Sequence, residues 1–113
     1  MMTRWNGCLL LTLLLMVVTT PAHAAPCKPV GANALVEFDF RETPLRDVTR
    51  WISCARNLNI MFQTADLSRH KVTWISSRKV KGRSLQRRFE AMLRQEGLRL
   101  RRNGGFLVIE SAP

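Results

Sequence analysis

The sequence has few of the residues from which catalytic and metal sites are built. Downstream of residue 24 it holds one histidine, His70, and two cysteines, Cys27 and Cys54, too few for a four-ligand zinc site. The acidic residues are scattered, and no nucleophile–base pair, glycine-rich phosphate loop or dinucleotide fingerprint is present. We therefore expect no enzymatic activity, no metal and no cofactor, and we expect His70 to be simply solvated.

Long apolar segments are also missing. The run Cys8–Val18 has 11 residues, whereas a membrane-spanning helix needs about 18 or more. Arg4 precedes this run, and Ala22–Ala24 follows it as a small-x-small cleavage site, which is typical of an export signal. We expect residues 1–24 to be a signal peptide cleaved near Ala24, and the mature protein to be located in the periplasm without a lipid anchor.

Internal repeats and low-complexity stretches are absent, and negative charge is scarce. Removal of residues 1–24 leaves 89 residues with 17 Lys and Arg against 8 Asp and Glu, a net charge of +9. This length suits one domain. We expect residues 25–33, which contain two prolines and a glycine, to form an N-terminal arm, and residues 34–113 to form the domain.

Two amphipathic helices alternate with short strands in the rest of the chain. Thr43 as N-cap and Pro44 at the first helical position predict a helix over Leu45 to about Arg56, ended by Asn57. Ser84 as a cap predicts a second helix, which Gly97 ends. Alternating or β-branched residues predict strands over Leu35–Phe40, Asn59–Gln63 and Val72–Ser76, with a polar connection over Thr64–His70 and a basic loop over Arg78–Arg83.

The C-terminal segment predicts a β-hairpin. Asn103-Gly104 is a preferred pair for a two-residue turn. This turn would pair Leu100 with Leu107 and Leu98 with Ile109 on one apolar face. The side chains expected on the other face are Arg99, Arg101, Phe106 and Val108. The element order is then β-α-β-β-α-β-β, which indicates a small single-domain α+β fold with two helices packed on small mixed sheets.

Cys27 and Cys54 are an even pair in an expected oxidising compartment, which favours a disulfide. On a helical wheel that starts at Leu45, Cys54 falls beside the polar arc, where the N-terminal arm could reach it. Such a bond would stabilise the fold by about 3 kcal/mol in the chain-entropy model. In the alternative interpretation Cys54 is a small buried apolar residue and Cys27 is a free thiol in a mobile arm.

Positive charge concentrates in the C-terminal half. One interpretation is a solvated basic surface, and the other is a patch for an anionic partner such as an acidic protein surface, lipopolysaccharide or DNA. On the second helix Glu90 could pair with Arg94. No aromatic row interleaves the arginines, so a stacking surface for single strands is weakly supported. The candidate patch comprises Arg87, Arg94, Arg99, Arg101 and Arg102. A second binding route is strand addition at an exposed sheet edge, which the sequence does not identify.

An ordered set of motifs runs through most of the chain: VEFDF, TPLRDVTRWIS, NLNIMF, KVTWISSRKV, MLRQEGLRL and GGFLVIES. In this order, Phe38 to Ser111 resembles the N-terminal (N-zero) domain of the secretins of type II secretion systems. It is also similar to the related short N-terminal domain of some TonB-dependent receptors. The resemblance implies the same α+β fold.

The resemblance also implies a role in protein transport. A secretin continues through further ring domains into a membrane pore, whereas this chain stops at Pro113, so we expect no channel activity. The implied function is a periplasmic protein-interaction module, an adaptor that docks to a secretin or inner-membrane component of a type II secretion or pilus-type envelope machine. Two alternatives remain: a basic periplasmic binder of polyanions (nucleic acid or lipopolysaccharide), and a signalling domain like that of TonB-dependent receptors.

Overall fold

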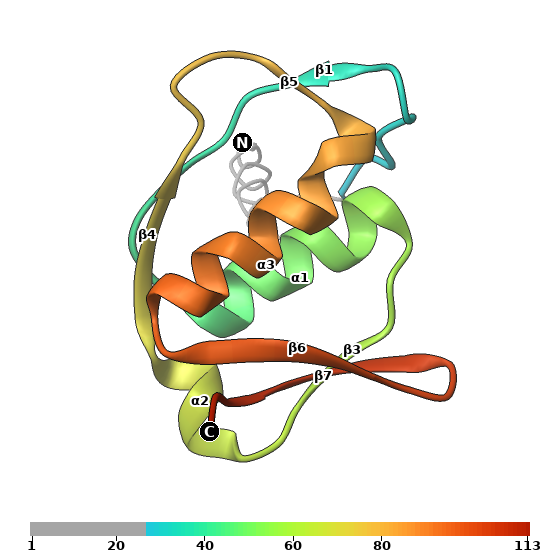
Figure 1. Ribbon diagram of the computed structural model, residues 1–113. Helices are drawn as coiled ribbons and strands as arrows, with labels where there is room; N and C mark the ends of the chain where they lie inside the picture. The colour runs from blue at the N-terminus through green and yellow to red at the C-terminus, as the bar shows by residue number, and fades with distance from the viewer. Residues whose placement is uncertain (1–26) are drawn as a thin grey trace, which may run out of the picture.

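The computed structural model describes residues 27–113, so the expected signal peptide lies outside the described residues (Figure 1). The helices are α1 (Leu45–Arg56), α2 (Ala65–Arg69) and α3 (Leu85–Gln95), and a 3₁₀ helix spans Gly82–Ser84. The strands are β1 (Leu35–Val36), β2 (Asp39–Pro44), β3 (Ile60–Phe62), β4 (Lys71–Ile75), β5 (Val80–Lys81), β6 (Leu98–Asn103) and β7 (Phe106–Ser111).

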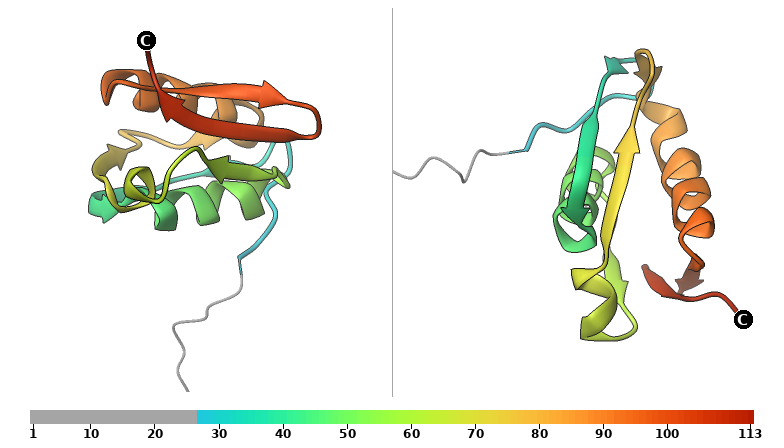
Figure 2. Two further views of the ribbon diagram at one scale, coloured as in Figure 1. Left: turned by 90° about the horizontal axis from the view of Figure 1, so that it is seen from below. Right: turned by 90° about the vertical axis from the view of Figure 1, so that its left-hand side faces the viewer.

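The two long helices, α1 and α3, lie side by side, and sheets cover two sides of the pair (Figures 1 and 2). The antiparallel pair β2–β4 covers one side. The mixed sheet β3–β7–β6, with β3 parallel and β6 antiparallel to β7, covers the other. A third pair, β1–β5, joins the start of the domain to the segment that precedes α3. The α+β fold class with small mixed sheets is therefore confirmed.

Apolar side chains from both helices fill the space between the sheets. The fully buried set includes Leu45, Val48 and Ile52 of α1, and Leu85, Phe89 and Leu93 of α3. Next to Phe89 lies an aromatic cluster centred on Trp74, whose ring centroid is 4.1 Å from that of Phe38 and 5.7 Å from that of Phe89. Trp51 and Phe40 complete this cluster. The aromatic residues thus stabilise the core.

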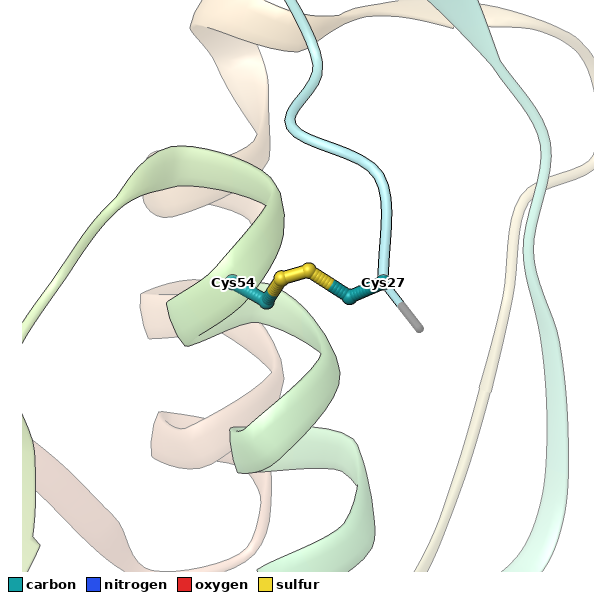
Figure 3. Close-up of a disulfide and its surroundings, with 2 residues drawn as sticks. All are labelled: Cys27 and Cys54. Atoms are coloured by element: carbon teal, nitrogen blue, oxygen red, sulfur yellow. A yellow bond between two sulfur atoms is a disulfide. The ribbon is translucent and has the colours of Figure 1, made fainter. Parts of the chain in front are cut away.

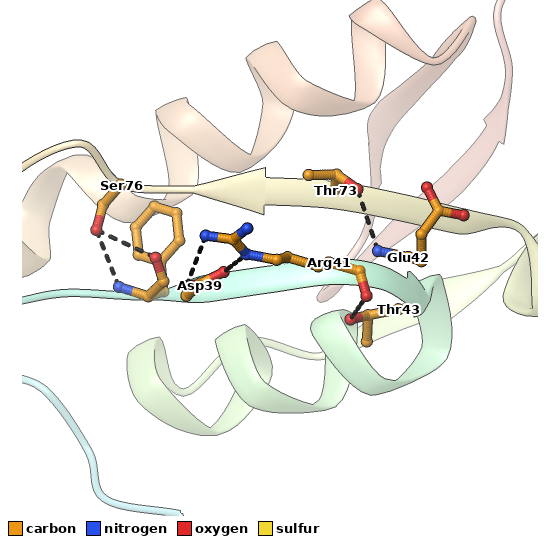
Figure 4. A network of polar contacts seen from close by, with 7 residues as sticks. Asp39, Arg41, Glu42, Thr43, Thr73 and Ser76 are labelled. Carbon is orange, nitrogen blue, oxygen red and sulfur yellow. Dashed lines mark hydrogen bonds and ion pairs between the residues drawn. The ribbon is translucent and has the colours of Figure 1, made fainter.

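The predicted strand Leu35–Phe40 is divided between two sheets. Its first two residues pair with β5, whereas the chain from Asp39 onward pairs with β4. Where the partner changes, the amide of Phe38 donates to Ser76 Oγ at 3.0 Å, and Ser76 Oγ donates to the Phe38 carbonyl oxygen at 3.2 Å (Figure 4). This side chain replaces a ladder hydrogen bond at the point where the strand switches sheets.

β2 continues four residues beyond its predicted end, and a bulge lies between Phe40 and Thr43. Glu42 has a positive φ of 49° at the irregularity, and its amide donates to Thr73 Oγ1 at 3.1 Å (Figure 4). Asp39 and Arg41 form an exposed ion pair of 2.8 Å on the same strand. A bulge inserts an extra residue without ending the pairing. The alternation of the sequence cannot show where such a residue lies.

The bounds of the two long helices agree with prediction; Ser84 holds the predicted N-cap position of α3, Thr43 does not hold that of α1, and neither side chain makes a capping hydrogen bond. Thr43 Oγ1 donates to the Arg41 carbonyl oxygen (Figure 4), and Pro44 takes the cap position without a side-chain bond. Ser84 Oγ donates to the Lys81 carbonyl oxygen, because a 3₁₀ helix already precedes α3. The predicted C-terminal ends of both helices are confirmed, because Asn57 with φ 56° and Gly97 with φ 77° have the left-handed conformation that ends a helix.

Two segments predicted to be irregular contain regular structure. The polar connection Thr64–His70 holds α2, and the basic loop Arg78–Arg83 holds β5 and the start of the 3₁₀ helix. Both elements are too short to show apolar periodicity, since α2 has five residues and β5 has two.

The hairpin forms at the predicted place but in another register. Asn103 pairs with Phe106, so the turn residues are Gly104 and Gly105 and not Asn103 and Gly104. Leu100 consequently lies opposite Ile109, and Leu98 opposite Ser111. The partners are displaced by two residues, and because side chains alternate with period two, each keeps its predicted face.

The N-terminal arm packs against the domain through its backbone. The amide of Val30 donates to the Ala55 carbonyl oxygen at 2.8 Å, and Arg56 Nη1 donates to the Val30 carbonyl oxygen at 2.6 Å. On the other side, the amide of Arg83 donates to the Ala32 carbonyl oxygen at 3.0 Å. The arm therefore bridges the end of α1 and the start of the 3₁₀ helix.

Within residues 27–113, none of the helices has the length and apolar character that crossing a membrane requires.

Candidate interaction surfaces

A groove of about 410 Å³ lies between α1 and β3. Its lining comes from three parts of the chain: Arg46, Thr49, Arg50 and Ser53 of α1; Leu58 to Phe62; and Phe106 at the start of β7. β3 is an edge strand, because it pairs with β7 on one side only. The groove therefore runs along an open sheet edge. We call it the β3 groove.

The backbone of β3 presents hydrogen-bonding groups to this groove. Leu107 donates its amide to the Asn59 carbonyl oxygen at 2.8 Å, and Gln63 donates its amide to the Ile109 carbonyl oxygen at 2.9 Å. Successive residues of a strand alternate in direction, so the amides and carbonyls of Ile60 and Phe62 point away from β7. Within the described part of the chain these groups have no hydrogen-bond partner. Such an edge is a template for one more strand.

Thr49 supplies an unpartnered polar atom in the lining of the groove. The residue is only 4% exposed, and its Oγ1 makes no hydrogen bond within residues 27–113. A buried hydroxyl without a partner is unfavourable and unusual in native proteins. Thr49 lies four positions after Leu45 and so falls on the apolar arc of the helix. The helical wheel could therefore have predicted a polar side chain on the buried face. Thr49 was not predicted to be a site residue.

Exposed apolar and cationic side chains border the groove. Met61 is 51% exposed and Phe106 is 49% exposed, which is high for residues of their size. Arg46 and Arg50 lie on the α1 side, where both approach Asp47, at 4.0 and 3.5 Å. The three charges together leave one net positive charge beside the groove. The β3 groove thus combines backbone, apolar and cationic contacts.

The predicted arginine patch does not form one free cationic surface. Glu110 accepts from Arg101 Nε at 2.9 Å and from Arg99 Nε at 2.5 Å, and its side chain is only 6% exposed. The hydrogen bonds from Arg101 and Arg99 hold the pKa of Glu110 below its usual value, against the opposing effect of burial. The carboxylate therefore offsets part of the charge of these two arginines.

The register explains this contact. Arg99 lies opposite Glu110 in the hairpin, and Arg101 lies opposite Val108. The predicted turn had placed Arg99 opposite Val108. The two-residue displacement of the partners brings Glu110 between the arginines.

The other members of the patch are exposed, and the structure separates Arg87 from the hairpin arginines. Arg94 and Arg102 make no ion pair in the described part of the chain, and the predicted Glu90–Arg94 pair is absent there. Glu90 instead accepts from Gln86 Nε2 at 3.4 Å. Arg87 lies at a second surface feature, a hollow of about 550 Å³ that we call the basic hollow. Its lining consists of Leu35, Arg78, Lys79, Val80, Lys81, Arg83, Ser84, Arg87 and Arg88.

The structure joins Cys27 and Cys54 in a disulfide, with their Cα atoms 6.0 Å apart (Figure 3). This separation is within the usual range for bonded cysteines. Cys54 is half-buried near the end of α1, on the side that the arm crosses. The bond therefore tethers the arm to α1, close to the hydrogen bonds of Val30.

His70 contacts an acidic residue, although we expected it to be simply solvated. Its Nε2 lies 2.7 Å from Glu96 Oε1, and its carbonyl oxygen accepts the amide of Leu45 at 2.7 Å. His70 thus links the end of α2 to the start of α1 and to the end of α3. Among residues 27–113, no three His, Cys, Asp or Glu residues gather as a metal site would require.

Comparison with known proteins gives a similarity in fold. No protein-family model and no curated protein matches the chain. Among solved structures, the chain is similar to the N0 domain of the type II secretin from enterotoxigenic Escherichia coli. The TM-score is 0.62 at 18% sequence identity, and the alignment covers 73% of this chain and 100% of that one. The chain therefore has the fold of a secretin N0 domain, and the resemblance read from the sequence motifs is confirmed for the fold.

Proposed function

We propose that this protein is a periplasmic docking module of a secretion or pilus-type envelope machine, and that it receives an extended segment of its partner along β3. The observation that carries the proposal is the open edge of β3 beside a groove. The fold, which is that of the N0 domain of a type II secretin, supports the choice of machine. Export through the expected signal peptide would bring the protein to that compartment.

Strand addition explains the features of the groove together. A partner segment beside β3 would bond to the outward backbone groups of Ile60 and Phe62, as in other peptide complexes at sheet edges. Side chains of the same segment would contact Met61 and Phe106, which are both exposed. Each hydrogen bond would contribute about 0.5–1.5 kcal/mol net, so several are needed for specific binding.

The chemistry of the groove favours binding over catalysis. Its lining carries guanidinium, hydroxyl, amide and apolar side chains, and it includes no histidine or carboxylate that could act as a catalytic base. Arg46 and Arg50 favour a partner segment with acidic side chains. We therefore propose a non-enzymatic module that selects its partner by backbone pairing and charge.

Site-specific photocrosslinking in cells that export the full chain tests this function. A photoreactive amino acid replaces Met61, and in a matched control it replaces Glu37, which is exposed outside the groove. We expect the Met61 position to capture a component of an envelope machine and the Glu37 position not to capture it. Equal capture at both positions, or capture of no such component at Met61, would contradict the proposal.

Hydrogen exchange of the purified complex tests the binding mode. An added strand should protect the amides of Ile60 and Phe62, because these point away from β7. The amide of Met61 points toward β7 and should change little, so it is an internal control. Protection that spares Ile60 and Phe62 would rule out strand addition at this edge even if the partner is correct.

A further inference from the structure

The basic hollow gathers six cationic side chains around one concave surface. They come from the loop before β5, from β5 itself, from the 3₁₀ helix and from the first turn of α3, and these segments are neighbours in Figure 1. All six are exposed: Arg78, Lys79, Lys81, Arg83, Arg87 and Arg88. No acidic residue lines the hollow, and the first turn of α3 holds none.

These cations are not used in ion pairs within residues 27–113. Arg83 Nη1 donates to Asn33 Oδ1 at 3.2 Å, and Arg88 Nε donates to Ser84 Oγ at 3.2 Å, so two of the guanidinium groups are held by neutral partners. This differs from the hairpin, where Glu110 offsets the charge of Arg99 and Arg101. Six like charges around one hollow repel one another unless an anion joins them.

The side chains that line the hollow indicate which kind of anion it would bind. Four of the six cations are arginines, whose planar guanidinium groups match phosphate oxygens bidentately. The lining has no aromatic side chain on which a base could stack, which disfavours single-stranded nucleic acid. Leu35 borders the same hollow and is 60% exposed, the most exposed of the large apolar residues in the described part of the chain. An exposed leucine among cations suits a ligand with phosphate groups and an apolar part.

We propose that the basic hollow binds the phosphate groups of an anionic lipid surface, with Leu35 inserting between the lipid molecules. Lysines and arginines near such a surface attract its headgroups, and a neighbouring apolar side chain adds burial. This would be a second binding function, because the basic hollow and the β3 groove share no lining residue. It would hold the protein at a membrane while the groove remains available.

Vesicle sedimentation tests the proposal, with protein purified after expression of the full chain so that all variants share one N-terminus. The vesicles contain phosphatidylcholine with or without about 30% phosphatidylglycerol. The double variant Lys79→Gln/Arg87→Gln removes two cations that make no side-chain hydrogen bond in the described part of the chain. It should reduce partitioning onto anionic vesicles roughly tenfold to thirtyfold. Binding by the unchanged protein should fall as salt is raised.

The matched control, Arg94→Gln/Arg102→Gln, removes the same charge from exposed positions outside the hollow. It should change partitioning less than about threefold if the site is local and not a property of net charge. Leu35→Ser should weaken binding, whereas Met61→Ser, at a comparably exposed residue outside the hollow, should not. Circular dichroism verifies that each variant is folded.

Three results would overturn the proposal. One is a lack of preference for vesicles with phosphatidylglycerol, and another is an equal loss in the two double variants. The third is binding of inorganic pyrophosphate without any binding to anionic vesicles, which would assign the hollow to a soluble phosphate ligand. None of these results bears on crosslinking at Met61, so the two functions are tested independently.

Discussion

Gly82 lies so close to Gly31 that a Cβ atom at position 82 would overlap the carbonyl oxygen of Gly31. The Cγ1 atom of Val30 would lie 2.8 Å from the same Cβ, and the backbone there is fixed by hydrogen bonds to Ala32 and Ala34. A side chain at position 82 would therefore require the backbone of Gly31 to move, and backbone cannot rotate out of the way as a side chain can. Glycine at position 82 lets the N-terminal arm pack on the domain.

Gly82→Ala should consequently destabilise the protein. Overpacking of a tight contact costs about 1–3 kcal/mol, and the loss should be visible as a lower midpoint of denaturant unfolding. Gly105→Ala is the control, because a Cβ at Gly105 meets no atom within 4 Å. Equal stability of the Gly82 variant and the unchanged protein would mean that the arm is not packed as described.

Reduction of the Cys27–Cys54 bond should lower the free energy of unfolding by about 3 kcal/mol, because the bond closes a long loop in the unfolded chain. The measurement is chemical unfolding with and without a reductant. The double variant Cys27→Ser/Cys54→Ser should match the reduced protein and show no response to reductant. Two free thiols in the unreduced protein, purified after expression of the full chain, would contradict the pairing.

Much of this fold can be predicted from the local sequence pattern. The hairpin is a case in which the local pattern predicts the faces of the strands but not their register. The faces of Leu98 and Leu100 were predictable because alternation has period two. The pairing register was not, because Asn103-Gly104 and Gly104-Gly105 are both good turn pairs and differ by one residue at the turn. That single residue decides whether Arg99 lies opposite Val108 or Glu110. Packing of the whole sheet makes the choice, and no short segment encodes it.

Glu110→Gln should destabilise the protein at neutral pH and remove part of its pH dependence. The pKa of Glu110 is lowered in the folded state by Arg101 and Arg99, so its ionised form stabilises the fold above the pKa of the unfolded chain. This contribution is lost as the pH falls through the lowered pKa of the folded state. Thermal unfolding should therefore show a difference between the two proteins at pH 7 that shrinks at pH 3.

The control for this effect is Glu37→Gln, since Glu37 is exposed and makes no side-chain bond within the described residues. Asp39 also has a lowered pKa, through its hydrogen bond to Arg41, so some acid sensitivity should remain in the Glu110 variant. A difference between the Glu110 variant and the unchanged protein that stays constant from pH 7 to pH 3 would show that the ion pairs do not stabilise the fold.

The β3 groove was less predictable than the helices that frame it. The segment Asn59–Gln63 indicated a strand, but whether that strand is central or at an edge depends on β7, which is more than forty residues away in the sequence. The basic hollow depends in the same way on β5 and the 3₁₀ helix, which were predicted as one irregular loop. Charge and apolar periodicity predicted which arginines could bind a partner but not which of them lie together. In the fold, Arg87 lines the basic hollow, whereas Arg99 and Arg101 pair with Glu110.

Thr49→Val should increase stability, in contrast to most substitutions of buried residues. The two side chains have nearly the same shape, and the hydroxyl of Thr49 is buried without a hydrogen-bond partner in the described part of the chain. Its removal should raise the free energy of unfolding by about 1 kcal/mol, because a buried polar group without a partner is costly. Thr73→Val is the matched control: Thr73 Oγ1 accepts the amide of Glu42 at 3.1 Å, so its loss should lower stability by about 0.5–1 kcal/mol. If Thr49→Val destabilises as much as Thr73→Val, the Thr49 hydroxyl already has a hydrogen-bond partner in the folded protein.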